Sequence, residues 1–115
     1  MFKTIFDDIN RNNPETYLIG IWGKDGLELE KATYLPSNLD SDLLGAELAD
    51  VLAKLDNFEM TSADICIEYN SGQFKVLVYS LNADYFLLLV SSQNQISGKI
   101  KFYLNLKKSN ILSLL

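Results

Sequence analysis

The fold is decided by residues 19–29, Ile19-Gly20-Ile21-Trp22-Gly23-Lys24-Asp25-Gly26-Leu27-Glu28-Leu29. Two apolar stretches flank an Asp-Gly pair, and this pair tolerates the positive φ that a tight hairpin needs. We therefore predict a strand over residues 17–22, a turn with Gly26 at positive φ, and a return strand over residues 27–34.

Three more strands are predicted in the second half of the chain, over residues 65–69, 74–81 and 85–91. Short polar turns at residues 70–73 and 82–84 join them into a meander of hairpins. Grouped hairpins of this kind favour an antiparallel sheet and argue against parallel βαβ units.

The strand patterns also predict a strand order. Residues 74–81 and 85–90 are apolar on both faces, as expected for strands that are covered on both sides. The third strand alternates and carries Asp64 and Glu68, whereas the second carries Glu28, Glu30 and Lys31. These two strands should be the edges, which gives the order 2-1-5-4-3.

Apolar residues at helical spacing predict three helices. The first contains Phe2, Ile5, Phe6 and Ile9 and should end in the polar stretch 10–14. The second, capped by Asp40 or Ser41, buries a stripe made of Leu44, Leu48, Val51, Leu52 and Leu55. The last follows a polar break at residues 93–98, and its inner face consists of Ile100, Tyr103, Leu104, Ile111 and Leu115.

The predicted order of elements is αββαβββα. We expect an α+β fold in which a five-stranded antiparallel sheet carries helices on both faces, a profilin-like sandwich. The chain contains no repeat and no linker-like tract, so a single domain should span residues 1–115.

Composition excludes several classes of function. The chain has 15 acidic and 10 basic residues, a net charge of −5, and its densest basic cluster is the pair Lys107-Lys108. Nucleic-acid binding and docking on anionic lipid both require a basic surface, so neither is expected. The longest apolar run, Tyr85 to Val90, is too short to cross a membrane, and the first residues lack a secretory pattern. We expect a cytoplasmic protein.

No catalytic residue, cofactor or metal ligand is expected. The chain has no histidine, and Cys66 is its single cysteine, which excludes an internal disulfide and the usual zinc sets. Asp64 and Glu68 should share a strand face with Cys66 and disfavour its thiolate. The carboxylate pairs Asp7-Asp8 and Glu28-Glu30 show no sign of an acid/base dyad. Gly20, Gly23 and Gly26 belong to a hairpin and cannot form a phosphate loop.

Arg11, the only arginine, has two interpretations. A protein that regulates GTPases can insert an arginine finger into the transition state. The other interpretation is an arginine near the end of the first helix, where positive charge is favoured by the helix dipole.

The succession of elements and the hairpin at residues 19–29 resemble the roadblock/LC7 domain. The helix around Gly45-Ala46-Glu47-Leu48-Ala49, the hairpin from Glu68 to Val76 and the segment Ser97-Gly98-Lys99-Ile100 fall where this family has its own. Trp22 departs from the resemblance, because a smaller residue is expected in that strand position. The resemblance implies a homodimer or heterodimer that regulates a small Ras-like GTPase or scaffolds a larger assembly.

Small residues on the second helix suggest where a dimer would form. Gly45, Ala49 and Ala53 recur every four residues beside Ala46, and small residues at this spacing allow another helix to approach closely. The alternative is surface alanine that serves helix propensity. With the edge strand, the predicted dimer interface consists of Gly45, Ala46, Ala49, Ala53, Ile65, Ile67 and Tyr69.

Two other functions remain open. The domain could sense a small ligand in a pocket between sheet and helix, or it could be a purely structural assembly domain of profilin- or longin-like fold. A ligand domain should contain a roomy apolar pocket with convergent polar groups.

Overall fold

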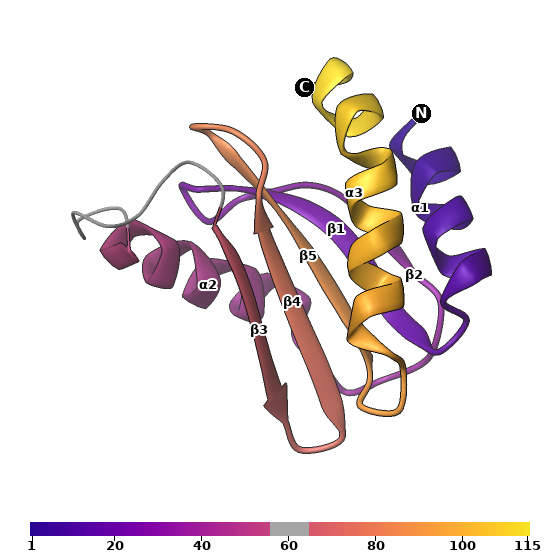
Figure 1. The fold of residues 1–115 in the computed structure, drawn as a ribbon. Helices are drawn as coiled ribbons and strands as arrows, with labels where there is room; N and C mark the ends of the chain where they lie inside the picture. Colours follow the sequence, from indigo (N-terminus) through magenta and orange to yellow (C-terminus); the bar gives the residue numbers. More distant parts are fainter. Residues whose placement is uncertain (56–64) are drawn as a thin grey trace.

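The computed structural model describes residues 1–55 and 65–115. Its five strands form one antiparallel sheet in the order β2-β1-β5-β4-β3, which confirms the predicted order. The strands are β1 (Thr16–Gly23), β2 (Glu28–Thr33), β3 (Cys66–Ser71), β4 (Phe74–Ser80) and β5 (Tyr85–Ser92). The helices are α1 (Phe2–Asn12), α2 (Ser41–Leu55) and α3 (Ser97–Ser113). Figure 1 shows α1 and α3 side by side on one face of the sheet and α2 on the other, which confirms the expected α+β fold.

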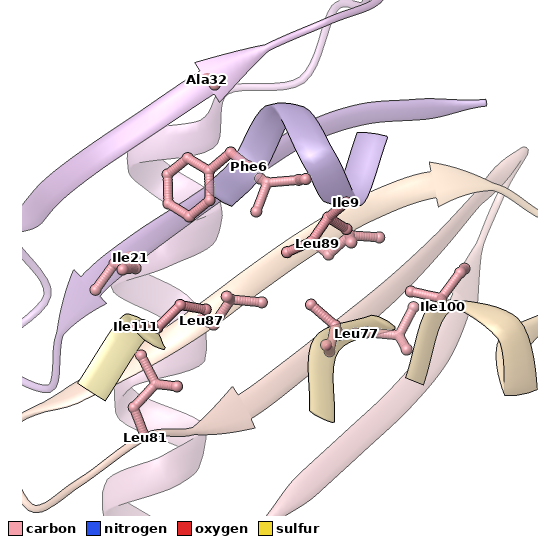
Figure 2. Packing of buried hydrophobic residues seen from close by; sticks show 12 residues of the cluster. Phe6, Ile9, Ile21, Ala32, Leu77, Leu81, Leu87, Leu89, Ile100 and Ile111 are labelled. Carbon is pink, nitrogen blue, oxygen red and sulfur yellow. The ribbon is translucent and has the colours of Figure 1, made fainter. Parts of the chain in front are cut away.

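The sheet separates two hydrophobic cores. Leu87 and Leu89 face α1 and α3, where Phe6 and Ile100 complete the core drawn in Figure 2. Leu88 and Val90 point to the opposite face, where they pack with α2 residues such as Leu48 and Leu52. Because successive side chains of a strand point to opposite faces, a central strand covered on both sides is apolar throughout.

The first hairpin closes as predicted. Gly26 has φ 92°, and its N–H donates to the carbonyl oxygen of Gly23 at 2.9 Å. The Gly23 N–H donates to the Leu27 carbonyl oxygen at 2.8 Å, while Asp25 Oδ1 accepts the Leu27 N–H at 3.0 Å. The Asp-Gly pair therefore supplies both a side-chain acceptor and the left-handed residue.

We expect Gly26→Val to destabilise the domain by about 1 kcal/mol or more, because a β-branched residue at positive φ is strained. Thermal unfolding followed by circular dichroism measures the loss. Gly98→Ala is the control, since Gly98 lies in the first turn of α3, its φ is not positive and an added Cβ meets nothing within 4 Å. An unchanged melting temperature for Gly26→Val would contradict the strain at this turn.

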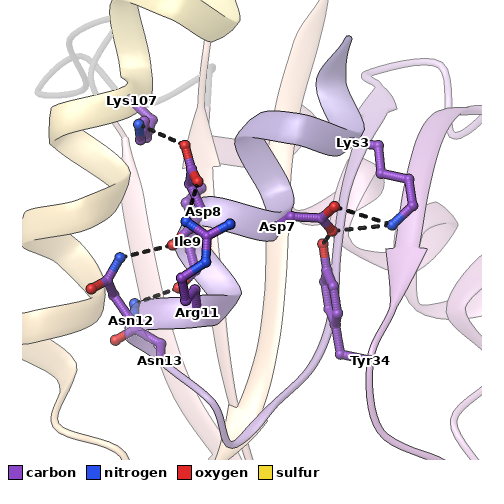
Figure 3. Close-up of polar contacts among 9 residues, drawn as sticks. All are labelled: Lys3, Asp7, Asp8, Ile9, Arg11, Asn12, Asn13, Tyr34 and Lys107. Atoms are coloured by element: carbon purple, nitrogen blue, oxygen red, sulfur yellow. Dashed lines mark hydrogen bonds and ion pairs between the residues drawn. The ribbon is translucent and has the colours of Figure 1, made fainter.

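The first helix ends at Asn12, within the predicted polar stretch 10–14. The helix continues to Asn12, since the side-chain amides of Asn12 and Asn13 donate to the carbonyl oxygens of Asp8 and Ile9, each at 2.9 Å (Figure 3). These bonds satisfy carbonyl groups that a helix end leaves without partners. The polar stretch that suggested a break thus holds the last turn in place.

Trp22 is fully buried between β1 and α2, where its ring fills a slot between two glycines. A Cβ at Gly20 would lie 2.4 Å from Trp22 Cζ3, and a Cβ at Gly45 would lie 2.3 Å from Trp22 Nε1. The resemblance led us to expect a smaller residue in this strand position, and the structure shows how the larger one is accommodated. The large ring fits because a glycine on its own strand and a glycine on α2 both leave room for it.

Candidate protein-binding surface

In the described part of the chain, β3 is an edge strand, and no strand pairs with its outer side. Ile65 and Ser80 form a hydrogen-bonded pair, in which the Ser80 N–H donates to the Ile65 carbonyl oxygen at 2.9 Å. Hydrogen-bonded pairs alternate along an antiparallel ladder, so Ile67 and Tyr69 also bond to β4. The backbone groups of the intervening residues, Cys66, Glu68 and Asn70, therefore point outward, away from β4.

The two edges of the sheet differ in how they resist pairing. The β2 edge is interrupted by a bulge opposite Ile21 and Trp22, and it carries the charged residues Glu28, Glu30 and Lys31. Bulges and charges are devices that discourage the pairing of edge strands. The β3 register is unbroken from Cys66 to Ser71 and contains one charged residue, Glu68. The unprotected edge is therefore β3.

One flank of α2 lies beside this edge. Leu44 and Leu55 pack into the same core as Ile65, Ile67 and Tyr69 and stay half-buried. Burial raises the pKa of the Tyr69 hydroxyl, and the nearby charge of Glu47 raises it further. Helical spacing places Val51, which is 41% exposed, on the same flank. Together these α2 residues and the β3 edge form what we call the β3–α2 surface.

The small residues of α2 do not form the free stripe that the sequence suggested. Gly45 lies against Trp22, and Ala49 is only 3% exposed within the core beneath α2. Ala46 and Ala53 are exposed, but Ala46 adjoins Gly26 in the first hairpin. Gly45 therefore leaves room for the ring of Trp22, and Ala46 leaves room for the hairpin turn at Gly26. Their part in a dimer contact remains a prediction, and the flank facing β3 is made of larger apolar residues.

Cys66 is exposed on the face of the sheet that carries α3. Burial raises the pKa of the Tyr79 hydroxyl, and a hydrogen bond to Cys66 raises it further, so the thiol partners a neutral phenol. Glu68 is held by α3, with Lys101 Nζ at 3.1 Å and Ser97 Oγ at 3.0 Å. Asp64, the other predicted neighbour of Cys66, lies outside the described residues. We predict no reactivity for Cys66.

The polar groups of α1 tie this helix to its neighbours (Figure 3). Arg11 lies in the last turn of α1 and bonds to Asp8 at 2.7 Å, and Lys107 of α3 bonds to the same carboxylate at 3.2 Å. Asp7 accepts the Tyr34 hydroxyl at 2.7 Å and pairs with Lys3 at 3.1 Å. These partners, Tyr34 first, lower the pKa of Asp7. The two aspartates thus serve separate contacts, and Arg11 occupies the helix-end position of its second interpretation.

Within residues 1–55 and 65–115, no cluster of three or more histidine, cysteine, aspartate or glutamate side chains is placed to hold a metal ion. The same part of the chain contains no helix that is long and apolar enough to cross a membrane.

Sequence reasoning found the β3 residues of this surface and missed the α2 flank. The signal was present, since Leu44, Val51 and Leu55 belong to the apolar stripe assigned wholly to the core. Leu44 and Leu55 stay half-buried and Val51 is exposed, so part of this stripe is not covered by the sheet. Apolar side chains left exposed beside one another are a candidate contact surface.

No protein-family model matches the sequence, and no curated protein resembles it in sequence. Solved structures do resemble the fold. MglC from Myxococcus xanthus is 21% identical with a TM-score of 0.66, over 99% of this chain and 98% of MglC. An MglB solved in a tetrameric arrangement is 16% identical with a TM-score of 0.76, over 96% of this chain and 85% of MglB.

A Roadblock/LC7 domain from Streptomyces avermitilis is 11% identical with a TM-score of 0.73, over 96% of this chain and 94% of that domain. Profilin IA from Acanthamoeba castellanii shares the same plan at 12% identity, with a TM-score of 0.64 over 99% of this chain and 98% of the profilin. The chain therefore has the roadblock/LC7 fold within the wider profilin-like architecture. Likeness at these identities establishes the fold, and function must be argued from the surface.

Proposed function

We propose that this protein is a non-enzymatic homodimeric regulator or scaffold that binds a small Ras-like GTPase in the cytoplasm, as a single domain over residues 1–115. The observation that carries the proposal is the regular, unprotected β3 edge beside the apolar flank of α2. An exposed edge of this kind is a liability for a protein at cellular concentrations, and pairing with another strand removes it.

A second copy of the chain is the simplest partner for that edge. Self-pairing across a two-fold axis would extend the sheet and bring together two identical α2 flanks. The predicted interface residues Ile65, Ile67 and Tyr69, half-buried beneath α2, would lie at that joint, and the exposed Val51 would add apolar area to it. Self-association also occurs in the tetrameric MglB that shares this fold.

The GTPase part of the proposal comes from the roadblock/LC7 resemblance. The charge distribution is compatible with it, because a chain of net charge −5 without a basic stripe is better suited to protein than to nucleic acid or anionic lipid. We propose no catalytic residue, cofactor or metal in this role, and no insertion into a membrane.

A pull-down tests the GTPase partner. The bait is this protein, and the prey is a Ras-like GTPase encoded beside its gene, loaded with GDP or with a non-hydrolysable GTP analogue. We expect retention to depend on the nucleotide, because GTPase switch segments are ordered differently in the two states. Equal retention, or none, in both states would argue against regulation and leave the structural alternative.

The ligand-sensing alternative requires a roomy apolar pocket. The apolar pocket between α3 and the sheet, lined by residues such as Leu81, Leu87 and Leu104, has a volume of about 10 Å³. A volume of this size holds at most about one water molecule. The groove of about 380 Å³ beside the first hairpin is open and is lined largely by turn residues such as Asp25 and Asp84. Neither site favours a small-ligand role.

A further inference from the structure

We propose that the outer side of α3 binds an acidic amphipathic helix of a partner protein. Apolar residues of that helix pack on Phe102 and Leu106, and its carboxylates pair with the lysines of α3. This surface lies on the face of the sheet opposite to α2 (Figure 1). It is therefore separate from the β3–α2 surface and goes beyond the proposed function. A scaffold with two such surfaces can hold two partners at once.

Apolar residues lie on two opposite sides of α3. Its inner side packs on the sheet through Ile100, Leu104 and Ile111. Helical spacing places Phe102 and Leu106, one turn apart, on the other side, where they are 60% and 57% exposed. Apolar residues all round a helix are typical of a helix that is covered on every side. Within the described residues, the outer side of α3 has no such cover.

The neighbouring helix α1 shows the composition of a side that faces solvent. It packs on the same face of the sheet, and its exposed residues, Lys3, Thr4 and Arg11, are all polar. Single exposed apolar residues are common on protein surfaces, whereas large apolar side chains that adjoin one another are a candidate contact surface. The pair of Phe102 and Leu106 is therefore better explained by a contact than by solvent.

The charge of α3 specifies the chemistry of the partner. The helix contains four lysines and no acidic residue, in a chain whose net charge is −5. Lys99 is exposed, and its ammonium group has no ion pair among the described residues. Helical spacing places Lys99 one turn before Phe102. A carboxylate on a partner therefore finds an unpaired cation at one end of the apolar pair.

The flank of α3 beside α1 also keeps a positive charge. Lys107 bonds to Asp8 at 3.2 Å, and Arg11 bonds to the same carboxylate at 2.7 Å. One carboxylate is thus shared by two cations and neutralises only one of them. On the other flank, Lys101 pairs with Glu68 at 3.1 Å and is still 39% exposed. Acidic groups of a partner are attracted to this helix along its whole length.

The same observations argue against two other occupants. The α3 of a second copy would bring two positively charged helices together, and like charges across a contact repel. An anionic membrane requires a broad basic surface, but Lys101 and Lys107 are ion-paired and the chain has a net negative charge. A protein helix fits best, because helices pack through ridges of residues four apart, the spacing of Phe102 and Leu106.

Two synthetic peptides test the class of partner. Each is a fluorescein-labelled helix of about five turns with leucine at positions i, i+3, i+4 and i+7. One peptide carries glutamate at its remaining exposed positions, and the other carries lysine. Fluorescence anisotropy with the full chain measures both dissociation constants. We expect the glutamate peptide to bind at least about tenfold more tightly at low salt, and added salt should reduce the difference.

Variants of α3 locate the binding site. Phe102→Gln combined with Leu106→Gln should weaken binding of the glutamate peptide at least about tenfold. Lys99→Glu should weaken it several-fold and favour the lysine peptide. The matched controls lie on α2, where Leu43→Gln removes a leucine that is 55% exposed and Lys54→Glu reverses an exposed lysine. Neither control should change binding. All five positions are exposed, so thermal unfolding should show that every variant stays folded.

Three results would overturn the inference. The first is a glutamate peptide that binds no better than the lysine peptide, or that binds the Phe102→Gln, Leu106→Gln variant as tightly as the wild type. The second is co-sedimentation with vesicles containing phosphatidylserine that this variant loses, which would assign the surface to a membrane. The third is a smaller assembly of this variant in light scattering, which would assign the surface to a second copy.

Discussion

Trp22→Ala should lower the free energy of unfolding by about 4 kcal/mol, because removal of a large aromatic residue from a core typically costs about 3–5 kcal/mol. The side chain is completely buried and packs with residues of α2 that include Leu48 and Leu52. Removing it would leave a cavity between β1 and α2. Urea unfolding followed by circular dichroism measures the loss, since the variant lacks the only tryptophan and cannot be followed by its fluorescence.

Gly45 and Gly20 leave the space that the Trp22 ring occupies, so a side chain that fills this space should also destabilise the domain. Gly45→Ala would place a Cβ 2.3 Å from Trp22 Nε1 if nothing moved, so either the ring or α2 must shift. Overpacking of this kind typically costs about 1–3 kcal/mol.

A double-mutant cycle isolates the fit between ring and glycine. In a Trp22→Ala background, Gly45→Ala should cost much less or even stabilise, because alanine is favoured over glycine in a helix by about 1 kcal/mol. Additive effects of the two substitutions would show that Gly45 is not there to admit the ring. Trp22→Phe is the conservative control. It removes the indole N–H, which has no hydrogen-bond partner among the described residues, and should cost less than Trp22→Ala.

Cys66→Pro should weaken the proposed dimer by about 2–6 kcal/mol while leaving the domain folded. The Cys66 N–H points outward, so a proline there removes no bond to β4, and edge strands tolerate proline at such positions. Two donors per dimer are lost, and two acceptors of the second copy are left without partners. Sedimentation equilibrium measures the dissociation constant, which should rise at least about thirtyfold.

Ile67→Pro is the matched control, one residue along the same strand. The Ile67 N–H belongs to the ladder with β4, so this proline removes a bond within the domain and should unfold or strongly destabilise it. A Cys66→Pro protein that dimerises as tightly as the wild type would exclude the β3 edge from the interface. Loss of folding in both variants would show that the outward assignment of Cys66 is wrong.

The strand order was predictable because the burial of a strand determines its local pattern of apolar and polar residues. Leu87 to Val90 must fill both cores, which requires apolar residues in succession, whereas Cys66 to Tyr69 face solvent on alternate positions. This signal needs no knowledge of distant contacts. The polar stretch 10–14 indicated where α1 ends but not at which residue, because the amides of Asn12 and Asn13 can either break a helix or satisfy its last carbonyl groups.

The sequence by itself determined the order of the eight elements, the two edge strands, the left-handed turn at Gly26 and the absence of a histidine base. Each of these features follows from local periodicity, turn chemistry or composition. Only the tertiary structure decided which side of α2 faces the sheet. Small and large apolar residues lie on adjacent stripes of that helix, so its rotation is ambiguous from the pattern alone. The contact of Trp22 with Gly45, distant in sequence, fixes the rotation, because close packing admits the indole ring only where a side chain is missing.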